Sequence, residues 1–294
     1  MITATARGKI NWLLRVVGRN EQRYHLLNMV LQSISIHDTL FFSLDSDLSL
    51  TTENMSLQSG EQVSDNLIFQ TAELLKKTFS VSQGANIHLV KGIPSGAGMG
   101  GGSADAAATF LALNTLWNLN LSLSQMKKLG LTLGADIPFC IEGGLQHVQG
   151  IGEKLTSYCP VPTYYLVVLQ PERALSTKEV FHRYAQHFPQ ITNPPISYEK
   201  QLLSALQEED FPVISAQMAN DLQSTSSLLC PDIPLALEAL LAHGALQAVM
   251  TGSGSAVFGL FSSKKQAEDA YRLLCLSWKK CFYCETCSSG VVLT

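Results

Sequence analysis

The segment that most restricts the fold is a glycine-rich loop between a strand pattern and a helix pattern. Pro94–Ser103 (PSGAGMGGGS) holds five glycines within residues 96–102. Before it, Ala85–Val90 (ANIHLV) alternates as strands do, and after it Ala104–Trp117 (ADAAATFLALNTLW) is rich in strong helix formers. Glycine lets backbone N–H groups approach an anion closely, and a helix start offers unpaired N–H groups. The sequence therefore predicts an anion-binding loop over Gly92–Ser103.

Three common nucleotide-binding loops fit this segment poorly. A Walker A loop needs Gly-Lys-Ser/Thr before its helix, and Gly102-Ser103 lacks the lysine. A dinucleotide fingerprint is formally present at Gly96-x-Gly98-x-x-Gly101, but residues 106–135 contain no Asp or Glu for the ribose. The H-R-D and D-F-G segments of protein kinases do not occur in the sequence. The loop therefore belongs to another class of phosphate-binding site.

Length and composition predict a two-lobed globular protein. The 294 residues are 46% hydrophobic and 15% charged, which is enough apolar material for a large core. The proline-containing Cys159–Thr163 (CPVPT) suggests a boundary near residue 155, giving domains 1–155 and 156–294. A net charge of −4 disfavours nucleic acid as a partner. Without an apolar run of membrane-spanning length or a signal peptide, we expect a cytoplasmic protein that binds no membrane.

A C-x-x-C-x-x-C pattern near the C-terminus is the one feature typical of metal ligation. It comprises Cys281, Cys284 and Cys287, and Ser288-Ser289-Gly290 follows where a ferredoxin-type cluster would need a further cysteine. The same residues lie in a stretch rich in Tyr, Phe, Thr and Val that is typical of a strand. We therefore interpret these cysteines as structural thiols.

Apolar periodicity predicts the other elements. Strands are expected at Lys9–Val17, Ser33–Ile36, Thr39–Leu44, Tyr164–Leu169, Ala245–Met250, Ala256–Phe261 and Phe282–Val292. Helices are expected at Asn66–Phe79, Ser122–Leu133, Ser176–His187, Tyr198–Gln207, Ile233–His243 and Lys264–Leu276. Ser64-Asp65 and Ser124 are candidate N-caps, and Asp45–Ser64 is expected to be a loop.

The glycine loop resembles the central motif of the GHMP kinase family, P-x-x-x-G-x-G-x-G. This family includes galactokinase and the homoserine, mevalonate and phosphomevalonate kinases. Ala6–Asn11 (ARGKIN) resembles its opening strand and Met250–Phe258 (MTGSGSAVF) its third, glycine-rich motif. Further matching segments, in order, are Gly18-Arg19, Tyr24-His25, Asp65–Leu67 (DNL) and Leu133–Pro138 (LGADIP). The resemblance therefore extends over almost the whole chain.

This resemblance implies an α+β fold with an N-terminal lobe like ribosomal protein S5 domain 2 and a ferredoxin-like C-terminal lobe. It implies an ATP-dependent kinase that uses Mg²⁺, for which the residues single out no ligand. The motif set is most similar to members that phosphorylate the 2-hydroxyl of 4-diphosphocytidyl-2-C-methyl-D-erythritol, a precursor in non-mevalonate isoprenoid biosynthesis. Two alternatives stay open: another GHMP kinase, of the homoserine or mevalonate type, and a non-catalytic ligand sensor. The sequence does not indicate an oligomeric state.

The same resemblance assigns roles to individual residues. Asp136 is expected to accept the hydroxyl proton, with Lys9 orienting it. Residues expected to bind the acceptor substrate are Asn11, Tyr24, His25, Thr177 and Phe181, with Phe181 stacking on the cytosine ring. Residues expected to bind ATP are Asn66, Pro94, Ser95, Gly96, Ala97, Gly98, Met99, Gly100, Gly101, Gly102, Ser103 and Ala104. The chain has Gln22-Arg23 where family members carry Asp-Gly, so the turn before Tyr24 is expected to differ.

Overall fold

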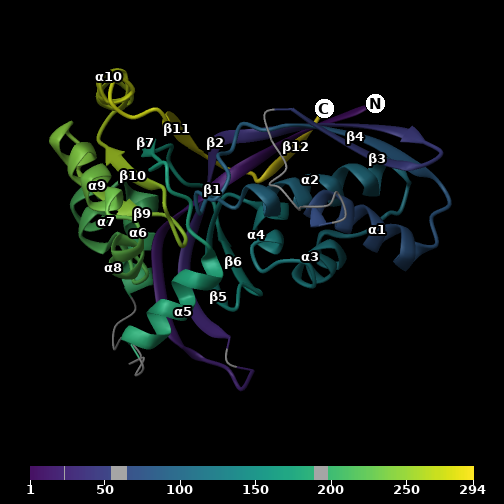
Figure 1. Ribbon diagram of the computed structural model, residues 1–294, viewed down its shortest axis with the longest axis horizontal. Helices are drawn as coiled ribbons and strands as arrows, with labels where there is room; N and C mark the ends of the chain where they lie inside the picture. Colours follow the sequence, from purple (N-terminus) through teal and green to yellow (C-terminus); the bar gives the residue numbers. More distant parts are fainter. Residues whose placement is uncertain (23, 54–64, 189–197) are drawn as a thin grey trace.

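The computed structural model describes residues 1–22, 24–53, 65–188 and 198–294 (Figure 1). The strands in this part of the chain are β1 (Ile2–Arg19), β2 (His25–Asp45), β3 (Leu48–Glu53), β4 (Gly84–Val90), β5 (Leu145–Gly150), β6 (Lys154–Tyr158), β7 (Tyr165–Leu169), β8 (Ala219–Asn220), β9 (Gln247–Met250), β10 (Val257–Phe261), β11 (Cys281–Cys287) and β12 (Val291–Leu293). The helices are α1 (Leu67–Phe79), α2 (Gly101–Leu116), α3 (Leu123–Leu131), α4 (Ile137–Glu142), α5 (Thr177–His187), α6 (Tyr198–Glu208), α7 (Phe211–Gln217), α8 (Gln223–Leu229), α9 (Asp232–Ala242) and α10 (Lys264–Leu274).

The long β1–β2 hairpin connects the two halves of the molecule. In Figure 1 it runs between a group formed by α1 to α4 and a group formed by α6 to α10. The sequence predicts two short strands at Ser33–Ile36 and Thr39–Leu44, but β2 is one continuous strand of 21 residues. It is long because successive parts pair with different strands: Leu27 with β5, Ile34 with β11 and Thr39 with β4. Pairing patterns of this kind are not visible in local periodicity.

The C-terminal segment returns to the first strand. One path through the sheet runs β12-β1-β2-β11-β7-β10-β9, and β12 pairs antiparallel with β1 through Ala4 and Leu293. The single strand predicted at Phe282–Val292 is therefore two strands, β11 and β12. The chain breaks between them because β11 pairs with β7 and β2, whereas β12 pairs on the far side of β1. The predicted division at residue 155 stays a prediction.

Helix starts and one strand differ from the sequence expectation. The α1 N-cap is Asn66, whose side chain accepts from Ile68 N, and the α3 N-cap is Ser122, which forms a capping box with Gln125. The predicted loop Asp45–Ser64 contains β3, whose leucines alternate with exposed residues. Its residues 54–64 lie outside the described part of the chain. Short elements without a strong apolar period, such as β6 and α7, were not predicted.

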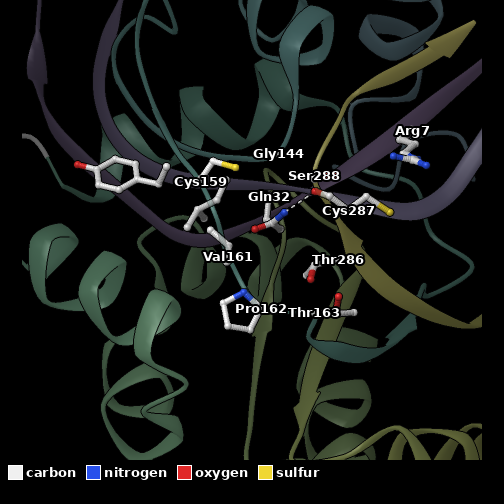
Figure 2. A pocket seen from close by; sticks show the side chains of 12 residues that line it. Arg7, Gln32, Gly144, Cys159, Val161, Pro162, Thr163, Thr286, Cys287 and Ser288 are labelled. Carbon is white, nitrogen blue, oxygen red and sulfur yellow. Dashed lines mark hydrogen bonds between the residues drawn. The ribbon is translucent and has the colours of Figure 1, made fainter.

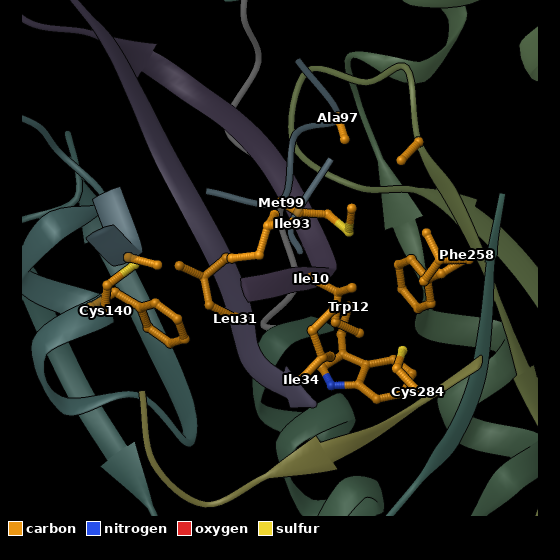
Figure 3. Close-up of a cluster of buried hydrophobic side chains, with 14 of the residues drawn as sticks. Ile10, Trp12, Leu31, Ile34, Ile93, Ala97, Met99, Cys140, Phe258 and Cys284 are labelled. Carbon is orange, nitrogen blue, oxygen red and sulfur yellow. The ribbon is translucent and has the colours of Figure 1, made fainter. Parts of the chain in front are cut away.

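An aromatic contact joins the two halves of the core (Figure 3). The Trp12 ring on β1 lies edge-on to Tyr164, with ring centroids 5.6 Å apart, and to Phe258 on β10, at 5.5 Å. Cys284 is buried in the same cluster as a free thiol. Side chains three residues apart on a strand point to opposite faces, so β11 keeps Cys281 and Cys284 apart. The described part of the chain has no single helix long and apolar enough to cross a membrane, although α8 and α9 together pass that test as a bent pair.

Candidate active site

The glycine loop alternates exposed backbone with buried apolar anchors. Gly96, Gly98 and Gly100 have φ of 64°, 75° and 70°, a region that side chains rarely adopt. Between them Ala97 and Met99 are each 1% exposed and point into the core (Figure 3). The loop is therefore a fixed turn that presents its backbone, whereas a flexible linker would carry no such anchors.

The loop leads directly into helix α2, whose first backbone amides have no side-chain cap. Gly100 is the N-cap and makes no side-chain hydrogen bond, so no cap covers the first N–H groups of this 16-residue helix. Ala104 is fully buried and its backbone N donates to Gly100 O at 2.9 Å, whereas Ser103 is half-buried. Free amides and the partial positive charge of a helix start suit the phosphates of a nucleotide.

A second glycine-rich turn, residues 251–255 between β9 and β10, supports the first. A methyl group on Gly98 would lie 2.3 Å from the Thr251 carbonyl oxygen, so glycine is required for this contact. Ala256 N donates to Ala97 O at 3.3 Å, and Thr251 Oγ1 donates to Gly98 O at 3.4 Å. Segments more than 150 positions apart thus meet at the loop, as the motif order implied.

Lys9 and Asp136 lie side by side at this helix start. Lys9 Nζ is 3.9 Å from Asp136 Oδ2; the lysine side chain is 4% exposed and the aspartate side chain 34%. Asp136 is the N-cap of α4, but its carboxylate makes no capping hydrogen bond and is free for other chemistry. A methyl group on Gly100 would come within 3.2 Å of Lys9 Cγ and 3.9 Å of Asp136 Oδ2. The loop, the lysine and the carboxylate therefore form one site.

Asn11 makes hydrogen bonds inside the protein with both its side chain and its backbone. It is 1% exposed, and its Oδ1 accepts from Lys9 Nζ at 2.7 Å and from Gly252 N at 3.0 Å. Its backbone N donates to Thr251 Oγ1 at 3.1 Å. These contacts link the opening strand, the lysine and the second glycine turn, so Asn11 fixes the Lys9 ammonium.

Asn66 is placed beside the loop by α1. Its Oδ1 caps that helix by accepting from Ile68 N at 2.9 Å, and its side-chain NH₂ group takes no part in this hydrogen bond. The next residue, Leu67, is 3.4 Å from where a methyl group on Gly102 would lie. The start of α1, which Asn66 caps, therefore contacts the loop through Leu67.

Of the other predicted residues, Tyr24, His25 and Phe181 lie at the far end of the hairpin, whereas Thr177 lies at the second glycine turn. The rings of His25, at the start of β2, and Phe181, on α5, have centroids 5.0 Å apart and an interplanar angle of 33°. Tyr24 is 64% exposed and has its backbone N bonded to Asn20 Oδ1 at 2.9 Å. Thr177, the first residue of α5, exchanges a hydrogen bond of 2.8 Å with Ser253 Oγ. Thr177 thus connects α5 to the second glycine turn.

The surroundings of His25 favour its neutral form and leave one ring nitrogen without a hydrogen-bond partner in the described part of the chain. Its Nε2 is buried and has no hydrogen-bond partner in the described part of the chain. Burial, and then the nearby charge of Arg19, lower the pKa of His25 below its usual value. A neutral imidazole with a free nitrogen is suited to the edge of a nucleobase, and an unsatisfied buried atom is a signal for a missing ligand.

Three buried charged residues behind the loop were not predicted as a group. Lys91 Nζ lies 2.5 Å from Asp38 Oδ2 and 3.0 Å from Asp105 Oδ2. The available signals were a charged residue inside the apolar strand β2 and a lysine directly before the loop. Neither signal identifies its partner, because Asp38 is 53 positions from Lys91.

The described residues around the loop offer few protein ligands to a magnesium ion that binds with ATP. Asp105 is engaged with Lys91 and 4% exposed, so it is not available as a ligand. Ser103 in the first turn of α2 carries a half-buried hydroxyl, and magnesium usually takes most of its oxygens from phosphates and water. The described residues include no group of three His, Cys, Asp or Glu that could hold a metal alone.

A separate cavity of about 360 Å³ lies beside β2 and β11 (Figure 2). Arg7, Gln32, Cys159 and Cys287 are among its lining residues, and none of the residues discussed above for the candidate site lines it. The Arg7 Nη1 already donates to Ser289 Oγ at 2.7 Å. This cavity is therefore distinct from the candidate active site.

Family models match both halves of the chain. The model for the GHMP kinases N terminal domain matches residues 66–144, and that for GHMP kinases C terminal matches residues 202–280. The first match contains the glycine loop and Asp136, and the second contains the turn at residues 251–255.

Curated relatives and solved structures agree with these matches. A 4-diphosphocytidyl-2-C-methyl-D-erythritol kinase of Lachnoclostridium phytofermentans is 37% identical over 92% of this chain and 91% of its own length. A crystal structure of 4-(cytidine 5'-diphospho)-2C-methyl-D-erythritol kinase has a TM-score of 0.80 and 29% identity, covering 97% of this chain and 98% of that one. A homoserine kinase from Cytophaga hutchinsonii shares the fold, with a TM-score of 0.75 at 18% identity, covering 100% of this chain and 97% of that one. The predicted α+β kinase fold is confirmed, and the chain belongs to the GHMP kinase family.

Proposed function

We propose that this protein transfers the γ-phosphoryl group of ATP to the 2-hydroxyl of 4-diphosphocytidyl-2-C-methyl-D-erythritol. The observation that carries the proposal is the Lys9–Asp136 pair beside the uncapped start of α2. Relatives named for this reaction, 33–38% identical over most of the chain, support the choice of acceptor. The product would be the 2-phosphate ester, with ADP as the second product.

The phosphate end of the site would position ATP. The backbone of residues 94–104 and the first amides of α2 would hold the phosphates, and Asn66 would lie beside the nucleotide. Ser103 would contribute its hydroxyl to the magnesium ion, which neutralises phosphate charge when it is bound. A loop anchored by the buried Ala97 and Met99 would lose little conformational entropy when ATP binds.

The chemical step requires one proton acceptor and one fixed positive charge. As the acceptor oxygen forms its bond to Pγ and the bond between Pγ and the bridging β-γ oxygen breaks, Asp136 would take the hydroxyl proton. Lys9 would keep that carboxylate ionised and stabilise charge on the transferred group. Asn11 would act through Lys9, because its Oδ1 holds the ammonium at 2.7 Å.

The far end of the hairpin would select the acceptor. His25 and Phe181 are already in ring contact at 5.0 Å, which leaves no space for a base between them. The cytosine would therefore stack on the outer face of Phe181 or under the exposed Tyr24, with its edge against the unpartnered His25 Nε2. Thr177 would hydrogen-bond the polar chain between base and reacting hydroxyl.

The division into domains 1–155 and 156–294 and a cytoplasmic location belong to the same proposal. One family match lies entirely before residue 155 and the other entirely after it. ATP as phosphoryl donor supports the cytoplasm as the location. The acceptor is a small molecule, and the proposal includes no nucleic-acid or membrane partner.

A panel of acceptors tests the proposal. ADP formation is measured with Mg²⁺ and ATP on the cytidine substrate, homoserine, mevalonate and phosphomevalonate at equal concentrations. Turnover on the cytidine substrate alone supports the proposed acceptor. Preference for another alcohol would reassign the acceptor within the family, and no turnover with any of them would favour a ligand sensor.

A further inference from the structure

Three charged side chains lie buried behind the glycine loop, and the proposed reaction uses none of them. Asp38 is on β2, Lys91 directly follows β4, and Asp105 is in the second turn of α2. Lys91 Nζ donates to Asp38 Oδ2 at 2.5 Å and to Asp105 Oδ2 at 3.0 Å. The exposed fractions of these side chains are 0% for Asp38, 9% for Lys91 and 6% for Asp105.

These residues connect the entry of the loop to the helix that follows it. Asp38 Oδ1 accepts from the backbone N of Gly92 and of Ile93, both at 2.7 Å. On the other side, a methyl group on Gly101 would lie 3.3 Å from Lys91 Nζ, which places the ammonium against the first residue of α2. The group thus holds both ends of the segment whose backbone faces the phosphates.

The charge of the group does not balance when both carboxyls are ionised. Two carboxylates and one ammonium would leave one net negative charge in the interior, which is costly without a partner. Asp105 Oδ1 has no hydrogen-bond partner in the described part of the chain. An additional proton on one carboxyl removes the net charge and supplies a donor.

The surroundings of Asp105 favour the proton there. Burial is the main cause that raises the pKa of Asp105, to about 8, against the opposing effect of Lys91; Asp38 raises it further. The Cys140 thiol on α4 also interacts with Asp105, and burial raises the pKa of this thiol, so that it stays neutral. Asp38 Oδ1 accepts from two backbone N–H groups, whereas Asp105 Oδ1 has no such donor in the described part of the chain.

We propose that Asp38, Lys91 and Asp105 form a positioning network that shares one proton between its carboxyls and fixes the glycine loop against the start of α2. The inference rests on the proposed function in that the loop binds the phosphates of ATP. In the protonated state the network is neutral and does not repel those phosphates. Lys91 is its central member, because it alone contacts both carboxyls.

Two substitutions separate the roles of charge and proton. Lys91→Met removes the ammonium that ties the two carboxyls together, and the KM for ATP should rise about 10- to 100-fold, the effect of losing charge-assisted hydrogen bonds. Asp105→Asn mimics the protonated carboxyl in shape and hydrogen bonding, and its KM for ATP should stay within about 3-fold of wild type. The KM for the cytidine substrate should change little in both variants, since its predicted site is at the hairpin end. Asp269→Asn, at an exposed i,i+4 pair on α10, is the matched control.

The pH dependence of stability tests the shared proton without any activity measurement. Because the folded state raises the pKa of Asp105 from 3.8 to about 8, this group's contribution to the unfolding free energy falls as pH rises across that interval. Chemical unfolding of wild type between pH 5 and 8, compared with Asp105→Asn, should show this decline in wild type and its absence in the variant. Asp269→Asn should follow wild type.

Two results would contradict the proposed positioning network. One is an Asp105→Asn variant whose KM for ATP rises as much as that of Lys91→Met, since an ionised carboxylate would then be needed. The other is identical pH profiles of stability for wild type and Asp105→Asn. A wild-type protein without kinase turnover would contradict the proposed function instead, and the stability comparison would still decide on the network.

Discussion

The two ends of the candidate site are built in different ways. At the phosphate end, Lys9 is 4% exposed, Asn11 fixes its ammonium, and two glycine-rich turns press against each other. At the base end, Tyr24 is 64% exposed and His25 keeps an unpartnered nitrogen. A rigid phosphate end suits chemistry that every kinase of this fold must perform, whereas an open base end suits the choice of one acceptor.

Replacing the proposed base should have the largest effect and should not alter the base end. Asp136→Asn removes the proton acceptor but keeps the shape of the side chain, so kcat should fall about 1,000-fold, within the usual range for general-base removal. The KM for the cytidine substrate should stay near the wild-type value. Steady-state kinetics checks this, with Asp232→Asn, at the exposed start of α9, as control. Near-normal kcat would remove Asp136 from the mechanism.

A methyl group at the helix start should damage the phosphate end specifically. Gly100→Ala places a side chain at φ 70° and 3.2 Å from Lys9 Cγ, so kcat/KM for ATP should fall about 100-fold. Gly244→Ala is a matched control, because Gly244 has φ 90° but has no atom within 4 Å of the added methyl group. Both variants should lose about 1 kcal/mol of stability from backbone strain. Equal activity of the two variants would mean that the close approach to Lys9 is unimportant.

Truncating the aromatic stack should affect the base end alone. Phe181→Ala removes a ring on which a base can stack, and the KM for the cytidine substrate should rise about 10-fold with little change in the KM for ATP. Phe188→Ala, which removes an exposed ring beside Tyr184 at the end of the same helix, is the control. A rise in the KM for ATP as well would show that the two ends are not separable.

The smallest effect should come from titrating His25. Its lowered pKa keeps the imidazole neutral through neutral pH, and protonation below that pKa removes the acceptor nitrogen. The KM for the cytidine substrate should therefore rise about 3-fold as pH falls from 7 through that lowered pKa, a modest change because one hydrogen bond is altered. His25→Gln should flatten this dependence. A wild-type KM that is constant over this range would argue against a contact with His25.

The residues at the phosphate end were more predictable from the sequence than the contacts that hold them in place. Glycine density, the helix that follows and the Lys9 and Asp136 motifs are local, and the structure brings them within 4 Å of one another. The contacts that hold them are not local: Asn11 meets Gly252 across 241 positions, and Lys91 meets Asp38 across 53. Such pairs depend on sheet register, which a single sequence does not specify.

The fold shows the same limit. Periodicity located α1, β4 and β7 to within a few residues, and the run of strong helix formers located α2. It divided β2 into two strands and merged β11 with β12, because a change of pairing partner leaves no local pattern. At the base end, the resemblance placed His25 and Phe181 around one base, but their direct ring contact depends on how α5 packs against the hairpin and was not predicted.

The most direct test of the account is to identify the product formed from ATP and 4-diphosphocytidyl-2-C-methyl-D-erythritol by phosphorus NMR. One new phosphate monoester on the tertiary carbon, an intact cytidine diphosphate and an equal amount of ADP are expected, with no ester formed by Asp136→Asn. A phosphate on another hydroxyl, or ADP without any ester, would contradict the placement of the acceptor between Asp136 and Phe181.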